Sequence, residues 1–135
     1  MVIGNCLVIV SWLLYPYFMV QHPTKFDLEP RTLAFAKSVL HLCQKLPNNV
    51  VNYKLIDQLI RSAGSIGANY REANDALGKK DFANRLRISR KEAKETIFWL
   101  ELVKEANPNL ETEILKLIDE CSQLRNIFSS IINKV

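Results

Sequence analysis

The sequence has little of what most catalytic and metal sites require. Its 135 residues include only two histidines, four glycines and three cysteines. Neither His22 nor His41 follows a glutamate by three residues, so the Glu-x-x-His pairs of di-iron bundles are missing. Glycine-rich phosphate loops and the Gly-x-Ser-x-Gly elbow of hydrolases are missing as well. We therefore expect no metal, no cofactor and no catalytic site in a protein that is not an enzyme.

The cysteines do not form a disulfide framework. They stand at positions 6, 43 and 121, are odd in number and include no Cys-x-x-Cys. Cys43 and Cys121 fall on apolar helical stripes, which predicts reduced core residues in a cytoplasmic protein.

What the sequence does contain is helical periodicity, most clearly in its central stretch. Apolar residues recur there in steps of four and three, which keeps them on one face of a helix: Leu55, Leu59, Ala63, Ile66, Tyr70, Ala73 and Leu77. We expect this helix to end near Leu77, with Gly78 in the left-handed conformation after it.

Small residues accompany this seam. Gly64 and Gly67 each cost a helix roughly 1 kcal/mol relative to alanine. We interpret them, together with Ala63 and Ala68, as a face on which a neighbouring helix packs closely. Ser65 and Asn69 are then expected to form hydrogen bonds between helices.

Three other segments have the same amphipathic character. The first helix spans about residues 28–46 and takes Asp27 as its N-cap, and Asn49 or Asn52 caps the central helix. The third helix stops near Asn107 and Pro108, and Asn109 caps the fourth. Four long helices joined by short turns alternate up and down around one core. The sequence therefore predicts an all-α, antiparallel four-helix bundle over residues 25–135.

A spaced set of residues in the second and third helices identifies a family: Gln58-Leu59, Arg61-Ser62-Ala63, Ser65-Ile66, Ala68-Asn69, Glu72-Ala73, Asp81-Phe82, Glu92-Ala93, Glu95-Thr96 and Trp99-Leu100. With this set the chain resembles, from Phe26 to Val135, the bacterial four helix bundle proteins, also called 23S rRNA-intervening sequence proteins. It also resembles the accessory protein of diversity-generating retroelements, a basic pentamer that engages nucleic acid and a reverse transcriptase.

The resemblance implies a bundle that assembles into a ring-shaped homo-oligomer, a pentamer. It implies no enzymatic activity. It assigns structural roles to one set of motif residues: Arg61, Ser62, Ser65, Asn69, Glu72, Glu92 and Trp99. From the antiparallel packing we expect Glu92 and Glu95 to pair with Arg61.

Residues 1–24 contain no Asp, Glu, Lys or Arg. The stretch 2–20 is long and apolar enough for a membrane span, but Gly4, Asn5, Ser11 and Pro16 interrupt it, and it lacks the features of a signal peptide. Three interpretations are open: an extension upstream of a true start at Met19, a membrane anchor, or an apolar arm that packs on the bundle. We favour the first, because the family resemblance begins after Met19, and we expect the bundle to fold without residues 1–18.

The third helix carries the strongest charge signal. Between Lys79 and Lys94 there are seven basic and two acidic residues, a balance of +5, whereas the whole chain carries +4. Five of the basic residues fall within an arc of roughly 100° on the side away from the seam. A solvated helix face normally mixes charges of both signs. We define the basic stripe as Lys79, Lys80, Arg87, Arg90, Lys91 and Lys94.

Two functions follow from this signal and from exposed apolar residues. The basic stripe predicts contacts with RNA or DNA phosphates, and only Phe98 continues it with an aromatic ring, so base stacking has little support. Ile88, Phe98, Trp99 and Leu102 lie outside the core seam, and the first helix has a spare apolar stripe, which together predict a homo-oligomer. The alternative is an adaptor that binds another protein, such as a reverse transcriptase-like partner, with a basic face that serves solubility alone.

Overall fold

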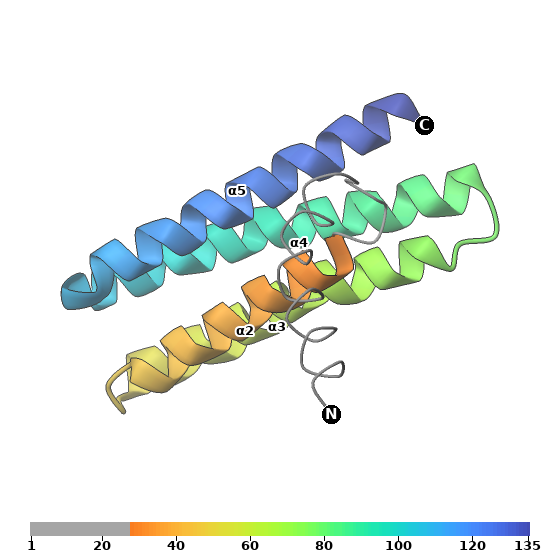
Figure 1. Cartoon of the computed structure of the whole chain (residues 1–135). Coiled ribbons are helices and arrows are strands. Elements are labelled where there is room, and N and C mark those ends of the chain that lie inside the picture. Colours follow the sequence, from red (N-terminus) through yellow and green to blue (C-terminus); the bar gives the residue numbers. More distant parts are fainter. Residues whose placement is uncertain (1–27) are drawn as a thin grey trace, which may run out of the picture.

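The computed structural model describes residues 28–135, and within them the chain is almost entirely helical (Figure 1). The elements are α2 (Leu28–Lys45), α3 (Val50–Asn74), α4 (Lys79–Ala106), the short 3-10 helix η1 (Pro108–Leu110) and α5 (Glu111–Lys134). The predicted all-α four-helix fold is confirmed. The expected N-cap Asp27 and the boundary at residue 25 lie outside the described residues.

Consecutive helices run antiparallel, so the connections gather at two ends (Figure 1). The α3–α4 turn and the C-terminus lie at one end, which we call the α3–α4 end. The α2–α3 turn and the α4–α5 connection lie at the other, which we call the α4–α5 end. α3 packs mainly on α4 and α2, and α4 also packs on α5.

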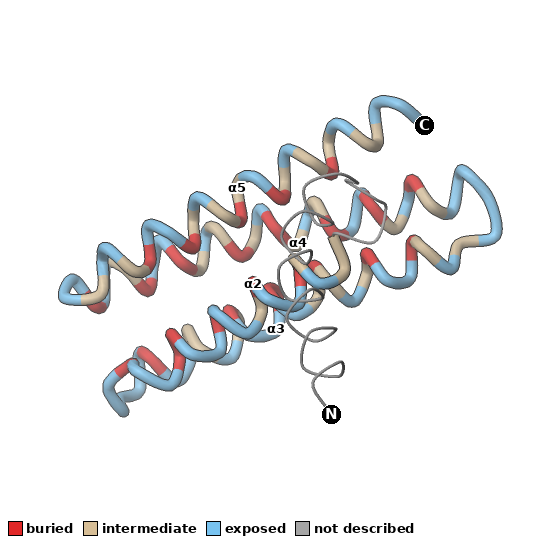
Figure 2. Tube along the Cα trace, in the orientation of Figure 1, coloured by how far each residue is buried: buried red, intermediate tan, exposed pale blue. Residues whose placement is uncertain are grey.

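Buried residues line the inward sides of α2, α3, α4 and α5 (Figure 2). The predicted seam of α3 is buried from Leu59 to Ala73, and Leu55 is half-buried. Leu77, however, is 100% exposed. The expectation that it belongs to the seam was wrong, because α3 ends at Asn74 and the helical periodicity no longer applies three residues later.

The polar links between helices differ from the expectation. Ser65 Oγ donates to the Arg61 carbonyl at 2.8 Å and Asn69 Nδ2 donates to the Ser65 carbonyl at 2.9 Å, so both bonds lie within α3. Each side chain reaches a carbonyl four residues earlier on its own helix, which competes with a bond to a neighbouring helix.

Buried hydroxyl groups supply the links instead. Thr96 Oγ1 of α4 donates to Ser62 Oγ of α3 at 3.0 Å. Ser89 Oγ of α4 donates to the Ile66 carbonyl at 3.0 Å. These bonds satisfy polar groups that the packing of α3 on α4 removes from water, and they fix the register of the two helices.

The small face of α3 is covered only in part. A Cβ at Gly67 would lie 2.9 Å from Thr32 Oγ1, so α2 passes closely there, as predicted. A Cβ at Gly64 would meet no atom within 4 Å, and Ala68 is also exposed. The expected close helix contact is therefore present at Gly67 and absent at Gly64 within residues 28–135.

The turns confirm one predicted cap and correct two others. Asn49 caps α3, since its side chain accepts the Asn52 N–H at 2.8 Å. Gly78 is extended, with φ 160° and ψ 174°, and not left-handed. The last carbonyls of α3 are already bonded by the N–H groups of Asp75 and Ala76, so no left-handed residue is needed. Asn109 does not cap α5, because Pro108 begins η1 and Leu110 precedes α5.

The structure also tests what was expected of the cysteines and of membrane-spanning helices. Cys43 and Cys121 are buried and carry free thiols, as predicted. No helix in the described part of the chain is both long and apolar enough to cross a bilayer. The stretch 2–20, on which the membrane interpretation rests, lies outside the described residues.

Candidate nucleic-acid interface

The basic stripe lies outside the core. α4 buries seven residues against its neighbours, from Ala83 to Val103, and none of them belongs to the stripe. Five stripe residues are exposed and Arg90 is half-buried. The sequence pattern therefore placed all six side chains correctly at the surface.

The carboxylates near the stripe are engaged elsewhere. Asp81 pairs with Arg85 at 3.9 Å and Glu92 pairs with Arg61 of α3 at 3.4 Å. Within residues 28–135 no carboxylate lies within ion-pair distance of a stripe residue. The positive charge of the stripe is therefore not neutralised by direct pairing in this part of the chain.

The side-chain partners that the stripe does have are neutral. Arg87 Nη1 donates to Asn84 Oδ1 at 3.0 Å, and Arg90 Nη1 lies 3.5 Å from Ser129 Oγ of α5. Arg90 therefore faces α5, whereas Glu92, two residues and about 200° further round the helix, faces α3. The guanidinium of Arg90 and the carboxylate of Glu92 are thus directed to opposite sides of α4.

Two further cations join the stripe from α5. Arg125 stands four residues before Ser129 and shares its helix face, the one that meets Arg90. Among residues 28–135 its guanidinium bonds to the neutral Asn126, with Nε 3.3 Å and Nη2 3.2 Å from Oδ1. Lys134 lines a surface hollow together with Lys79. Sequence reasoning missed both, although residues 121–135 contain two basic and no acidic side chains.

Charge is also distributed unequally along the bundle. Residues 95–120, at the α4–α5 end, hold seven acidic and two basic side chains, a balance of −5. Residues 79–94 hold +5 and residues 121–135 hold +2. The α4–α5 pair therefore has a positive end and a negative end, and a polyanion is attracted to the α3–α4 end.

The family motif residues form contacts between α3 and α4. Arg61 pairs with Glu92 and with Glu95 of α4, as predicted. Within α4, Trp99 Nε1 donates to Glu95 Oε1 at 3.2 Å. Ser62 accepts the bond from Thr96 described above. The other three motif residues contribute less, because Ser65 and Asn69 bond within α3 and Glu72 is exposed.

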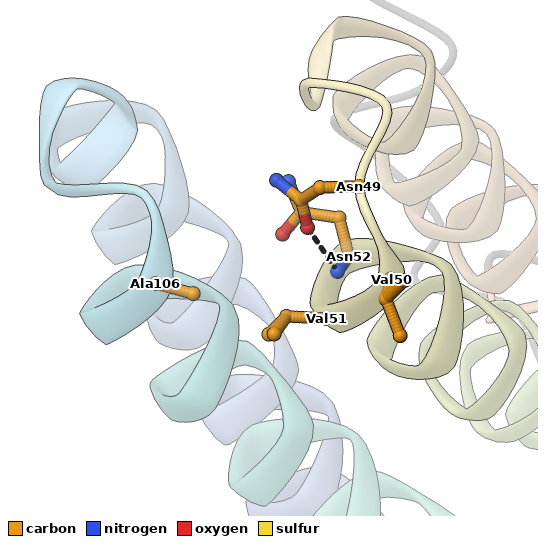
Figure 3. A pocket seen from close by; sticks show the side chains of 5 residues that line it. All are labelled: Asn49, Val50, Val51, Asn52 and Ala106. Atoms are coloured by element: carbon orange, nitrogen blue, oxygen red, sulfur yellow. Dashed lines mark hydrogen bonds between the residues drawn. The ribbon is translucent and has the colours of Figure 1, made fainter.

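A hollow at the surface of the described bundle is lined by neutral side chains. It has a volume of 520 Å³, lies at the α4–α5 end and is lined by Asn49, Val50, Val51, Asn52 and Ala106 (Figure 3). Its lining has no titratable side chain. The Asn49 side chain serves the cap of α3, and the Asn52 side-chain amide bonds to the Pro47 carbonyl and to Asn107. Within residues 28–135 no three His, Cys, Asp or Glu side chains lie close enough together to hold a metal ion.

Comparison with known proteins agrees with this architecture. The family model described as 23S rRNA-intervening sequence protein matches residues 25–130. A solved structure with a TM-score of 0.69 and 31% identity covers 77% of this chain and 96% of its own. It is a protein of unknown function from the S23 ribosomal protein family of Bacteroides thetaiotaomicron. No curated protein matches the chain. The chain belongs to the 23S rRNA-intervening sequence protein family.

Proposed function

We propose that this protein is a non-enzymatic, oligomeric module of the cytoplasm that binds RNA through phosphate contacts. The observation that carries the proposal is the unneutralised basic stripe of α4, widened by Arg125 of α5. Holding cations apart from carboxylates costs electrostatic energy, and a bound polyanion would remove that cost. The family's printed name, 23S rRNA-intervening sequence protein, gives the context for choosing RNA.

The geometry suits the nucleic-acid backbone more than it suits bases. From Lys80 to Lys94 the stripe extends about 21 Å along α4, at 1.5 Å per residue. The side chains on it are basic, with Phe98 as the aromatic continuation, 57% exposed. Phosphate contacts of this kind position the protein on the nucleic acid but do not recognise its bases. We therefore expect the affinity to depend little on the RNA sequence.

Assembly would strengthen such contacts. Leu33 and Leu40 of α2 remain 43% and 42% exposed, and Phe98 and Leu102 of α4 57% and 39%. Exposed apolar area of this kind favours a homo-oligomer, and the family resemblance suggests five subunits. Several copies of the stripe in one particle would bind one RNA by avidity. Light scattering that returns a monomer at micromolar concentration would remove this part of the proposal.

A protein partner is the second candidate. Ile88, Phe98 and Leu102 are 38%, 57% and 39% exposed on the outer side of α4. An adaptor would use this apolar face and keep the basic stripe for solubility. The two functions differ in their response to salt, since each phosphate contact releases counterions and makes affinity fall as salt rises.

The test is a titration of labelled, structured RNA at two salt concentrations. It compares the wild type with a variant in which Arg87, Arg90, Lys91 and Lys94 are reversed to glutamate. We expect tight binding of the wild type at low salt and none by the variant, with unchanged helical circular dichroism. The adaptor function would be favoured if affinity changed neither with salt concentration nor with the four substitutions. It would also be favoured if the wild type did not bind the RNA at all.

A further inference from the structure

The turn between α3 and α4 presents an apolar side chain directly to solvent. Leu77 is 100% exposed, whereas the other large exposed apolar residues between positions 28 and 135 range from 38% to 76%. Its position follows from the end of α3 at Asn74 and from the extended backbone of Gly78, which leads the chain into α4. A fully exposed leucine removes no apolar surface from water on folding, so it adds nothing to the stability of the fold. Turns ordinarily carry polar residues or glycine.

Two lysines and one aspartate lie next to this leucine. A hollow of 480 Å³ is lined by Leu77 together with Lys79, Lys80, Asp81 and Asn84. The Asp81 carboxylate pairs with Arg85 at 3.9 Å. A second hollow of 350 Å³ is lined by Lys79 and Lys134. Leu77 therefore projects from the positive end of the bundle, at the point where the basic stripe begins.

We propose that Leu77 packs against an unpaired base of an RNA whose phosphates are held by Lys79, Lys80 and the rest of the basic stripe. The inference rests on the proposed RNA binding and names the preferred substrate class: a duplex interrupted by an unpaired nucleotide. Apolar side chains are used in this way when proteins insert them between bases next to phosphate contacts. In an uninterrupted duplex the base faces are stacked on one another, so Leu77 has no surface to cover.

The experiment uses the full chain and two RNA hairpins of equal phosphate number, one with a single bulged nucleotide in its stem and one fully paired. Three proteins are compared: the wild type, Leu77→Ser and the control Val50→Ser. Val50 is a suitable control because it is 76% exposed and lies at the opposite end of the bundle, where α3 begins. Leu77→Ser makes no charge change and removes no buried contact, so it leaves the fold and the salt dependence unchanged.

We expect the wild type to prefer the bulged hairpin by roughly three- to tenfold, from the apolar area that one leucine side chain can cover. Leu77→Ser removes that preference and leaves affinity for the paired hairpin intact, and Val50→Ser changes neither. Equal affinity of the wild type for both hairpins, or an equal effect of Leu77→Ser on both, overturns this inference and leaves the proposed function standing. Failure of the wild type to bind either hairpin at low salt overturns both.

Discussion

The side-chain amides of Asn52 and Asn107 exchange two hydrogen bonds across the α4–α5 end. Asn52 Nδ2 lies 3.2 Å from Asn107 Oδ1, and Asn107 Nδ2 lies 3.0 Å from Asn52 Oδ1. The residues are 1% and 3% exposed. Each amide also donates to a carbonyl, Asn52 to that of Pro47 and Asn107 to that of Val103, both at 2.9 Å. The pair therefore ties the α2–α3 turn to the end of α4 without using charge.

Removing one member of this pair should destabilise the bundle. Asn107→Ala leaves buried polar atoms of Asn52 without their partner, and we expect the free energy of unfolding to fall by roughly 2 kcal/mol in urea denaturation. The double variant with Asn52→Ala should lose less than the two single losses combined, because the second substitution removes the atoms that the first left unpaired. Additive losses would show that the two amides contribute independently.

The two helical glycines of α3 should respond to alanine in opposite directions. At Gly64 a Cβ meets no atom within 4 Å, so Gly64→Ala should stabilise the monomeric bundle by about 0.5 to 1 kcal/mol through helix propensity. At Gly67 the Cβ would lie 2.9 Å from Thr32 Oγ1 and 3.2 Å from Thr32 Cβ, so Gly67→Ala should forfeit this gain and destabilise the fold. Thermal unfolding of the two variants side by side measures the difference, and equal shifts of both midpoints would contradict it.

The buried thiols should be unreactive in the native protein. Burial raises the pKa of Cys43 to about 11 and the pKa of Cys121 to about 12. Since the thiolate is the reacting species, both thiols stay protonated and covered at pH 8. In a Cys6→Ser background, a disulfide reagent should modify Cys43 and Cys121 rapidly only after denaturation. Fast modification of the native protein would show that the core opens locally.

The same thiols make stability depend on pH in the alkaline range. Their pKa in the folded protein lies above the ordinary value of 9.0, so the unfolded chain loses these protons first. The contribution of the two protonated thiols to the free energy of unfolding is therefore fully present below pH 9. It falls as the pH rises toward 11 and 12. Cys121→Ala should therefore lose less stability between pH 8 and pH 10.5 than the wild type does in urea denaturation. Identical losses would mean that other groups govern the alkaline range.

Periodicity within one helix was predictable from the sequence, and the places where it failed have physical causes. The seam of α3 was correct up to Ala73 and wrong at Leu77, because spacing does not reveal where a helix stops. Ser65 and Asn69 were assigned to the wrong kind of bond, since each can also bond to a carbonyl of its own helix.

The candidate interface was predictable only where it lies on a single helix. The six stripe residues follow one another along α4, so helical geometry alone placed them together. Arg125 is 35 positions after Arg90 and joins it only because Ser129 faces α4. Charge counts along the chain cannot show which side of one helix meets another. That contact between α4 and α5 had to come from the structure.

The salt dependence of RNA binding tests the central claim most directly. Two variants with the same change in net charge are compared with the wild type: one neutralises Arg87, Lys91 and Lys94 to glutamine, and the other neutralises the exposed, remote Lys37, Lys54 and Lys116. If the stripe contacts phosphates, the slope of log affinity against log salt becomes shallower by about 2 to 3 in the stripe variant and changes little in the remote variant. Equal slopes for the two variants would contradict the account, because binding would then depend on net charge and not on this surface.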